Sequence, residues 1–549
     1  MREIDRLTTE RYATPSLLLM EQAATAAARE ISAQFEGDVS HKNIWVLCGK
    51  GNNGGDGAAL ARALCNAGAR VDVDLFGRVE DTKGDARINF EIVRSLNGFV
   101  DGSPTLSYPL TFFEIDDIAT WEDIKWINFG NVDVIVDALF GTGLTRPLEG
   151  LPSEVVKHLA RIRERHENAR GTSPIIVSLD VPSGLNAGSA EIIGTAVQAD
   201  LTITFTAPKP ANVLPPARHH NGELVIANIG SPAKLIDEAP SDLFLVEPED
   251  VRRWLVQTRY TPDSYKNTHG HALVIAGSRD YTGAPVLCGD AAMRAGAGLV
   301  TVATAASAHN AVSARLMPEV ITAALPETND GAISFEAFES AAKLIERANT
   351  IAIGPGLSSG GDSTRRFVHA IIENRRTPVV IDADALNALA PWPNDLPGSD
   401  DFPLILTPHT GEMRRLIGAA NEAPLADRVA VARDFASAHN LILVLKGSRT
   451  LIATPDGRVF VNPTGNAGLG TAGSGDTLTG IIAGFIAQAF GTLKKEASAL
   501  EAVIAAVYVG GLAGDIAARE KGLRTLVASD VREHFSAAIR ALDAEGETP

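Results

Sequence analysis

The sequence predicts an α/β protein of two domains, each built on a mainly parallel β-sheet. Short apolar runs rich in β-branched residues alternate with helical stretches along the chain, which is typical of buried parallel strands joined by helices. The 549 residues exceed what one hydrophobic core holds. A stretch rich in proline, serine and acidic residues, 230–250, indicates a connection, so we expect domains at 1–240 and 241–549.

The first series contains one helix and six candidate strands. The helix is expected from Ser16 to about Ile31, because Leu17–Met20 and the alanine-rich run that follows suit a helix. A sheet covered by helices on both faces would explain the strands' apolar character. The candidate strands are Ile44–Cys48, Val71–Phe76, Val132–Ala138, Ile175–Leu179, Leu201–Phe205 and Leu224–Ile229.

The second series has the same character and ends in a hairpin and a long helix. An Asp456-Gly457 turn predicts a β-hairpin from Thr450–Ala453 and Arg458–Val461. A helix is expected from Thr477, with a buried face at helical spacing formed by Leu478, Ile481, Ile482, Phe485 and Ile486. The candidate strands before the hairpin are Ala272–Ala276, Leu299–Ala303, Thr350–Ile353, Val379–Asp382, Leu404–Leu406 and Leu441–Leu445.

Composition excludes several classes of protein. A net charge of −18 argues against nucleic acid as a partner but not against nucleotides, which a few local groups hold. The three cysteines, Cys48, Cys65 and Cys288, are odd in number and far apart, which favours buried free thiols in a reducing compartment. The charged N-terminus lacks an apolar signal core, and no stretch offers ~20 uninterrupted apolar residues. We therefore expect no membrane segment and a cytoplasmic location.

The first candidate site is the glycine-rich segment GKGNNGGDG, residues 49–57, which joins a strand to a helix. A strand, a glycine turn and a helix N-terminus together form a phosphate cradle. The spacing fits neither the Rossmann fingerprint nor a P-loop. The paired asparagines and Asp56 add oxygens that suit a cation or sugar hydroxyls. A purely structural glycine turn is the alternative interpretation.

Two carboxylates, Asp137 and Asp180, end further strands of the first series. Asp137 precedes a Phe-Gly-Thr-Gly-Leu loop, and Asp180 precedes Val-Pro-Ser-Gly. Ligands of parallel α/β sheets bind at the carboxyl ends of the strands, so these loops and residues 49–57 should converge on one cleft. Taken alone, either aspartate is as readily explained as a helix cap.

The strings GKGNNGGDG, VDALFGTGL and SLDVPSG, behind REIDR and SLLLME, resemble the NAD(P)HX epimerase domain over roughly residues 1–235. That family binds the hydrated nicotinamide cofactor and a potassium ion. The resemblance implies that Asp180 is the acid/base that interconverts the R and S hydrates at C6. It assigns potassium to Asn53, Asp137 and Ser183, which all offer the oxygen that a hard cation prefers. The implied cofactor contacts are Asn52, Asn53, Gly54, Gly55, Asp56, Gly141, Thr142, Gly143, Leu144, Thr145, Arg146 and Pro147.

The most informative stretch of the chain is AGLGTAGSGDTLTGIIAG, residues 467–484, where a glycine-rich loop ends in Gly475-Asp476 and enters the long helix. Backbone N–H groups and the positive helix end meet there, which favours an anion. A carboxylate at that point is poorly placed to bind phosphate but well placed to take a proton from a hydroxyl that is being phosphorylated. The alternative is a glycine turn with Asp476 as a helix cap.

Four further loops of the second half carry candidate groups: 354–357, 407–412, 446–450 and 295–298. Gly356 would let a ligand approach the backbone closely. His409 is as readily a core or surface histidine as a site residue. Lys446 offers a cation to a nucleotide phosphate, with a solvated charge as the alternative. The absence of a Walker lysine excludes a P-loop kinase.

The strings HALVIAGSRDYTGAPVL, MRAGAGLVTVAT, IGPGL, TPHTGE, LKGSRT and GNAGLGTAGSGDTLTG resemble the NAD(P)HX dehydratase family, within the ribokinase-like superfold, over nearly all of residues 255–490. One departure is Tyr265-Lys266, where the family commonly has His-Lys. The resemblance implies that Asp476 activates the C6 hydroxyl for phosphorylation, after which loss of phosphate regenerates the reduced ring. It also implies that Ala297, Gly356, His409 and Asp476 hold the hydrate, and that Lys446, Gly447, Ser448, Arg449, Thr450 and Gly475 hold the adenine nucleotide.

The two resemblances support one another, because an epimerase supplies the S hydrate that an S-specific dehydratase consumes. We expect NADHX and NADPHX as substrates, potassium in the first domain, magnesium with ADP or ATP in the second, and a homo-oligomer. The first rival is a ribokinase-like small-molecule kinase with an accessory nucleotide-binding domain. The second rival makes the first half a silent binding or scaffolding module.

Overall fold

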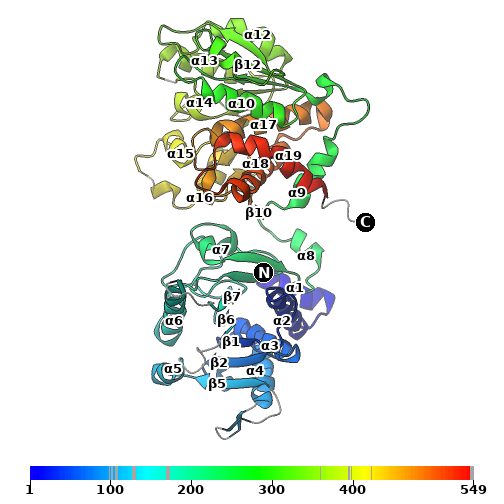
Figure 1. Cartoon of the computed structure of the whole chain (residues 1–549), viewed down its shortest axis with the longest axis vertical. Helices are drawn as coiled ribbons and strands as arrows, with labels where there is room; N and C mark the ends of the chain where they lie inside the picture. The colour runs from blue at the N-terminus through cyan, green and yellow to red at the C-terminus, as the bar shows by residue number, and fades with distance from the viewer. Residues whose placement is uncertain are drawn as a thin grey trace. The chain divides into compact units, whose positions relative to one another are not determined.

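The computed structural model describes all residues except 98, 101–102, 105–108, 126–131, 168–172, 359, 394–395, 397, 422 and 545–549. The chain divides into two compact units, Met1–Pro240 and Ser241–Pro549 (Figure 1). Each unit is a parallel or mainly parallel sheet flanked by helices, which confirms the predicted fold class.

The first unit contains a seven-stranded parallel sheet in the order β5-β2-β1-β6-β7-β8-β9. The chain runs outward from β1 through β2 to β5, and then returns to β6 on the other side of β1. The order therefore reverses between β1 and β6, where α/β proteins bind ligands. The strands are β1 (Asn43–Cys48), β2 (Arg70–Phe76), β5 (Leu110–Ile115), β6 (Val134–Ala138), β7 (Ile175–Leu179), β8 (Leu201–Phe205) and β9 (Glu223–Ala227).

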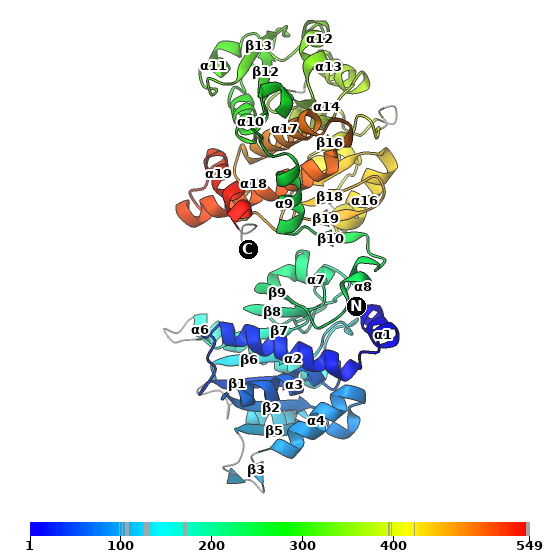
Figure 2. The same ribbon diagram turned by 90° about the vertical axis from the view of Figure 1, so that its right-hand side faces the viewer.

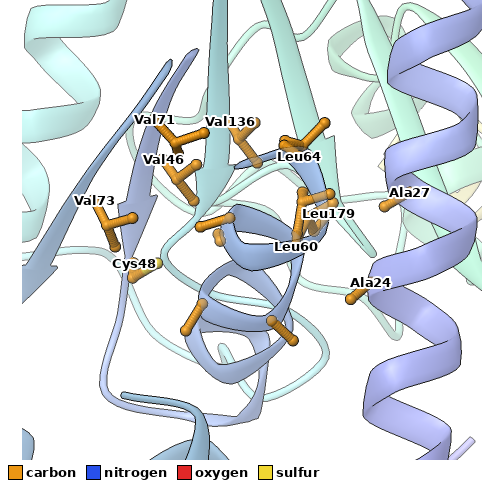
Figure 3. Packing of buried hydrophobic residues seen from close by; sticks show 14 of the residues in the cluster. Ala24, Ala27, Val46, Cys48, Leu60, Leu64, Val71, Val73, Val136 and Leu179 are labelled. Carbon is orange, nitrogen blue, oxygen red and sulfur yellow. The ribbon is translucent and has the colours of Figure 1, made fainter. Parts of the chain in front are cut away.

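Helices cover both faces of this sheet. On β1, Val46 and Cys48 enter one apolar cluster while Trp45 and Leu47 enter another, as the alternation of side chains in a strand requires. Figure 3 shows the first cluster, in which residues of the strands face α3 and α2. The helices are α1 (Arg2–Tyr12), α2 (Ser16–Ala33), α3 (Asn52–Asn66), α4 (Gly84–Leu96), α5 (Ile118–Ile124), α6 (Gly150–Glu167), α7 (Pro210–Val213) and α8 (Ala233–Asp237).

The second unit contains a ten-stranded sheet in the order β10-β19-β18-β17-β16-β15-β14-β11-β12-β13. The order in which the chain adds strands reverses between β11 and β14, which are themselves parallel. Strand β18 is antiparallel to both of its neighbours. The strands are β10 (Leu243–Leu245), β11 (His271–Ile275), β12 (Leu299–Ala305), β13 (Ile321–Leu325), β14 (Thr350–Ile353), β15 (Val379–Ile381), β16 (Leu404–Leu406), β17 (Ile442–Leu445), β18 (Leu451–Ala453) and β19 (Val459–Val461).

A group of long helices packs together in the second unit (Figure 2). Of the described helices, α18 is long and apolar enough to cross a membrane, yet 72% of its apolar window is buried. It packs against α17 and α19, as a core helix of a globular domain does. The helices are α9 (Pro248–Gln257), α10 (Gly283–Arg294), α11 (His309–Ser313), α12 (Ala337–Arg347), α13 (Asp362–Glu373), α14 (Ala383–Ala388), α15 (Thr410–Leu416), α16 (Arg428–His439), α17 (Ser474–Thr492), α18 (Ala499–Lys521) and α19 (Ala528–Ala544).

Several elements differ from the sequence-based expectation. The stretch 230–250 is not a plain connection, because it contains α8 and β10, and β10 pairs with β19. The edge strands β5 and β13 and the helix α1 were not predicted. Helix α17 begins at Ser474 rather than Thr477, so Asp476 lies inside its first turn.

Candidate active sites

A cavity of about 570 Å³ opens at the carboxyl ends of the strands in the first unit. Two loops meet there across the β1/β6 reversal: a Cβ atom on Gly49 would lie 2.0 Å from the carbonyl oxygen of Leu139. Of the predicted residues, Asn52, Asn53, Asp56, Gly141, Thr142, Gly143 and Asp180 line the cavity.

The other predicted residues of the loops lie outside the cavity lining. Gly54 and Gly55 allow close packing of the chain. A Cβ atom on Gly54 would lie less than 3.0 Å from Gly49, and one on Gly55 less than 3.0 Å from Ala86. Leu144, Thr145, Arg146 and Pro147 follow the part of the loop that lines the cavity. Helix α3 has Gly51 as its N-cap and no side-chain cap bond, so its first N–H groups are available to an anion.

Asp180 is the best-positioned carboxylate of this cavity. Its backbone adopts the left-handed conformation with φ 66°, which turns the side chain at the end of β7. Lys209 forms a buried ion pair with its Oδ1 atom, and Thr204 Oγ1 lies 3.3 Å from the same oxygen. A Cβ atom on Gly141 would lie 3.1 Å from Asp180 Oδ2 and 3.2 Å from Asn53 Oδ1. Gly141 therefore keeps the space between these two polar groups open.

Further acidic groups surround Asp180. Burial raises the pKa of Asp56 well above its usual range, and the negative charges of Asp180 and Asp5 raise it further. Asp5 and Arg2 come from α1 and also line the cavity. Sequence reasoning missed Asp5, Arg2 and Lys209. Lys209 follows the carboxyl end of β8 between two prolines, which is the signal that could have revealed it.

Asp137 and Ser183 are not part of the cavity lining, and they are hydrogen-bonded to one another. Ser183 Oγ donates to Asp137 Oδ1 at 2.6 Å, and Ser178 Oγ donates to Asp137 Oδ2 at 2.8 Å. Asp137 is fully buried, and burial raises the pKa of its carboxyl group despite these bonds. Asn53 is 9% exposed, and its Nδ2 has no hydrogen-bond partner among the described residues.

The second unit gathers most of its predicted site residues at the carboxyl ends of β14 to β17. Lys446 Nζ lies 2.7 Å from Asp382 Oδ1 and 3.9 Å from Glu412 Oε2. A Cβ atom on Gly475 would lie 3.3 Å from Lys446 Nζ, so the glycine admits the ammonium group to the start of α17. The pKa of Asp476 responds to the charges of four neighbouring groups: Asp382, Lys446, Asp384 and Glu412.

Asp476 is not a helix cap. The N-cap of α17 is Gly473, in the left-handed region at φ 85°, and the helix has no side-chain cap bond. Burial raises the pKa of Asp476 to about 6, and the nearby Asp382 carboxylate adds to the rise. The arrangement is an uncapped helix N-terminus, a cation and a carboxylate that is ionised at neutral pH, which suits proton abstraction beside a phosphoryl group.

His409 and the loop 446–450 are held by local bonds. His409 Nδ1 accepts a hydrogen bond from the Gly411 N–H at 2.9 Å and caps α15, while its side chain stays 56% exposed. Arg428 donates a hydrogen bond to the carbonyl oxygen of Ser448 at 2.9 Å and so holds the backbone of this loop. The other ring nitrogen, Nε2, lies 3.5 Å from Glu412 Oε1, so both edges of the exposed ring face groups of its own loop.

Ala297 is not part of this group. It is fully buried and precedes β12, at the amino end of the sheet, whereas Gly356 follows the carboxyl end of β14. The residues beside Gly356 are Tyr281 and Ala284: a Cβ atom on Gly356 would lie 2.9 and 3.2 Å from their Cβ atoms. The structure thus separates Ala297 from the site and places these two residues there instead.

Among the described residues, no group of three or more histidine, cysteine, aspartate and glutamate side chains forms a metal centre. Fold and sites together define a nucleotide-binding α/β enzyme with two separate active sites. Known families match each half: residues 272–536 match the family described as NAD(P)H-hydrate dehydratase, and residues 16–211 match the YjeF-related protein N-terminus.

Full-length relatives match the whole chain. A bifunctional NAD(P)H-hydrate repair enzyme of Moorella thermoacetica is 39% identical over 100% of this chain and 97% of its own length. The enzyme of the same name from Thermofilum pendens is 36% identical, over 99% and 96%. The protein therefore belongs to the family of bifunctional NAD(P)H-hydrate repair enzymes, as the sequence motifs predicted.

Among solved structures, an ADP/ATP-dependent NAD(P)H-hydrate dehydratase from Bacillus subtilis, co-crystallised with ATP and Mg²⁺, is 32% identical to this chain. The match covers 55% of this chain and 98% of that one, with a TM-score of 0.46.

Proposed function

We propose that the first unit interconverts the R and S epimers of NAD(P)HX and that the second unit dehydrates the S epimer to NAD(P)H with ADP or ATP as phosphate donor. The observation that carries the proposal is Asp476, a carboxylate in the first turn of an uncapped helix, beside Lys446. The membership of the chain in a bifunctional repair family supports both halves.

In the second unit, Asp476 takes the proton of the C6 hydroxyl while that oxygen attacks the terminal phosphorus of the donor. The bond from this phosphorus to its bridging oxygen breaks, and the shortened nucleotide, AMP from ADP or ADP from ATP, leaves with the electron pair. The C6–O bond then breaks, phosphate leaves with its electrons, and loss of a proton from C5 restores the ring double bond. Lys446 and the first N–H groups of α17 stabilise the charge on the transferred phosphoryl group. In this proposal, Gly447–Thr450 and Gly475 hold the donor, and Gly356 and His409 hold the hydrate.

Magnesium fits the donor side of this site. Mg²⁺ is usually held by one or two carboxylates together with substrate phosphates, rather than by a cage of protein ligands. Glu412, which lies 3.9 Å from Lys446, is a carboxylate that meets this requirement. The ion would neutralise charge on the phosphates.

In the first unit, Asp180 moves the protons as the C6 hydroxyl leaves and a water returns on the other face. The buried ion pair with Lys209 fixes the direction of its carboxylate. Asn52, Asn53, Asp56 and Gly141–Gly143 line the cavity that would receive the nicotinamide half.

Potassium fits beside this cavity. Asp137 carries a buried charge for which no ion pair is recorded among the described residues, and a monovalent cation would compensate it. Asn53, Asp137 and Ser183 offer the oxygen ligands that such an ion takes.

Recovery of absorbance at 340 nm tests both activities on a mixture of R and S hydrates of NADH, with potassium, magnesium and either ADP or ATP. We expect full recovery with at least one donor. Recovery that stops at the S fraction, above the slow spontaneous exchange, would leave the first unit as a silent module. Absence of recovery with either donor would favour the small-molecule kinase.

A further inference from the structure

The strand order of the second unit places its candidate site residues in a row along the carboxyl edge of the sheet. Lys446 follows β17, Glu412 follows β16, Asp382 follows β15, and Gly356 follows β14. With the roles proposed above for Lys446 and Gly356, the donor nucleotide would lie toward β17 and β18, and the hydrate toward β14 and β11. The next strands beyond the hydrate, β11 and β12, also end in loops at this edge.

Tyr281 projects from the loop that follows β11. Its side chain is a large apolar group that is 57% exposed. The loop is fixed against the Gly356 loop: Gly277 N–H donates to the Pro355 carbonyl at 2.8 Å, and Ser278 Oγ donates to the Gly356 carbonyl at 2.9 Å. An exposed aromatic ring on a fixed loop beside a nucleotide site is well suited to stack on a base.

Arg315 supplies a cation next to this ring. It follows α11 beyond the carboxyl end of β12, and its Nη1 atom lies 3.5 Å from the hydroxyl oxygen of Thr282. Among the described residues, no ion pair of Arg315 is recorded, whereas the neighbouring Arg279 lies 3.4 Å from Glu327. Arg315 is exposed and free to pair with a phosphate.

We propose that Tyr281 and Arg315 form a rim subsite that binds the non-reacting half of the hydrate, with Tyr281 stacked on its adenine and Arg315 paired with its pyrophosphate. The proposal rests on the proposed dehydratase function. The reacting nicotinamide half must lie near Asp476, so the other half of the dinucleotide extends away from the donor, toward β11 and β12. The rim subsite makes the enzyme selective for a hydrated dinucleotide over a hydrated mononucleotide.

The test compares two substrates on the full chain at a saturating donor concentration. The S hydrates of NADH and of reduced nicotinamide mononucleotide share the reacting ring, but only the first carries adenine and a pyrophosphate. For Tyr281→Ala we expect kcat/KM to fall roughly tenfold with the NADH hydrate and to stay within about twofold with the mononucleotide hydrate. Tyr281→Phe should keep kcat/KM with the NADH hydrate near the wild-type value, because the aromatic ring is retained.

Arg315→Ala should give a similar loss with the NADH hydrate, smaller at high salt because the contact is ionic. Tyr265→Ala is the matched control: its ring is 62% exposed but precedes β11, at the other end of the sheet, and both substrates should react as in the wild type. Equal losses with both substrates for Tyr281→Ala, or no loss with either, would overturn the rim subsite. A wild-type protein that dehydrates neither hydrate would instead overturn the proposed function.

Discussion

The ammonium group of Lys446 lies 2.7 Å from the carboxylate of Asp382, which is only 1% exposed. Thr479 Oγ1 donates to the second oxygen of Asp382 at 2.7 Å, so the buried carboxylate is satisfied on both sides. Burial would lower the pKa of Lys446, but the Asp382 and Glu412 carboxylates outweigh burial and the pKa is raised. The pair thus holds a charged lysine at the N-terminus of α17.

Lys446→Met should damage both stability and nucleotide binding. Removing one partner of a buried pair leaves the Asp382 charge uncompensated, at a cost on the order of 3 kcal/mol in the free energy of unfolding. The double variant Lys446→Met/Asp382→Asn should regain most of that stability, measured by urea unfolding, without regaining affinity for ADP or ATP in calorimetry. Recovery of nucleotide affinity in the double variant would contradict the proposed role of Lys446.

Dehydration should depend on the ionisation of Asp476. Because its pKa is about 6, kcat/KM should be constant above about pH 7 and fall tenfold per pH unit well below 6. Asp476→Asn should lose activity by 10²-fold or more, on the scale of general base catalysis. Calorimetric binding of ADP or ATP near the wild-type affinity would show that the variant is folded. A pH profile that is flat between 5 and 8 would argue against Asp476 as the base.

Epimerisation should depend on Asp180 and its partner Lys209. Asp180→Asn should lower the enzymatic rate by about 10²-fold or more, because the proton acceptor is lost. Lys209→Met should lower it by a smaller factor, roughly tenfold, because Asp180 remains but loses its buried cation.

Chromatographic separation of the epimers, without ADP or ATP, measures exchange alone once the spontaneous rate is subtracted. Dehydration of pure S hydrate by the same preparations is the internal control, and it should be unchanged. A Lys209→Met enzyme that epimerises at the wild-type rate would exclude a role for the pair.

Asp74 should make the stability of the first unit depend on pH. It is fully buried, and Trp45 Nε1 donates to its Oδ2 at 2.8 Å. Burial raises the pKa of Asp74 to about 7, whereas the unfolded chain ionises near 3.9. The folded state therefore retains a proton that the unfolded state releases, and stability falls as pH rises from about 4 to about 7.

Asp74→Asn should weaken this dependence, since the amide oxygen still accepts from Trp45 but does not titrate. The shift of about three units corresponds to roughly 4 kcal/mol at most between the two ends of the range. Urea unfolding followed by tryptophan fluorescence at pH 5 and pH 8 measures the difference. The same pH dependence in variant and wild type would show that Asp74 does not titrate in this range.

The sequence predicted the interior strands well because each is buried on both faces and therefore apolar throughout. The edge strands β5, β10 and β13 were missed for the opposite reason, whereas the edge strand β9 was predicted. Only one of the five residues of β13 is buried, and all three residues of β10 are at least partly exposed, so neither has a continuous apolar run. The pairing of β10 with β19 joins segments that are far apart in the chain, which no local pattern encodes.

The candidate sites show the same limit. Asp180 and Lys446 were predicted as site residues because loops at the strand ends of a parallel sheet share one edge, and Asp476 was predicted from the glycine-rich entry to α17. Lys209 and Tyr281 were missed because their contacts, with Asp180 and with Gly356, join different loops. Ala297 was placed in the site by resemblance, although it precedes its strand and so lies at the opposite edge.

The strand order of the second unit also bears on how the enzyme tells its two substrates apart. The phosphate donor and the hydrate each carry an adenosine diphosphate group, so either could occupy the seat of the other. Four strand intervals separate β11 from β17, which is about 19 Å at the usual spacing. With the proposed rim subsite, the adenine of the hydrate would bind beside β11 and that of the donor beside β17, so a high concentration of one substrate need not displace the other.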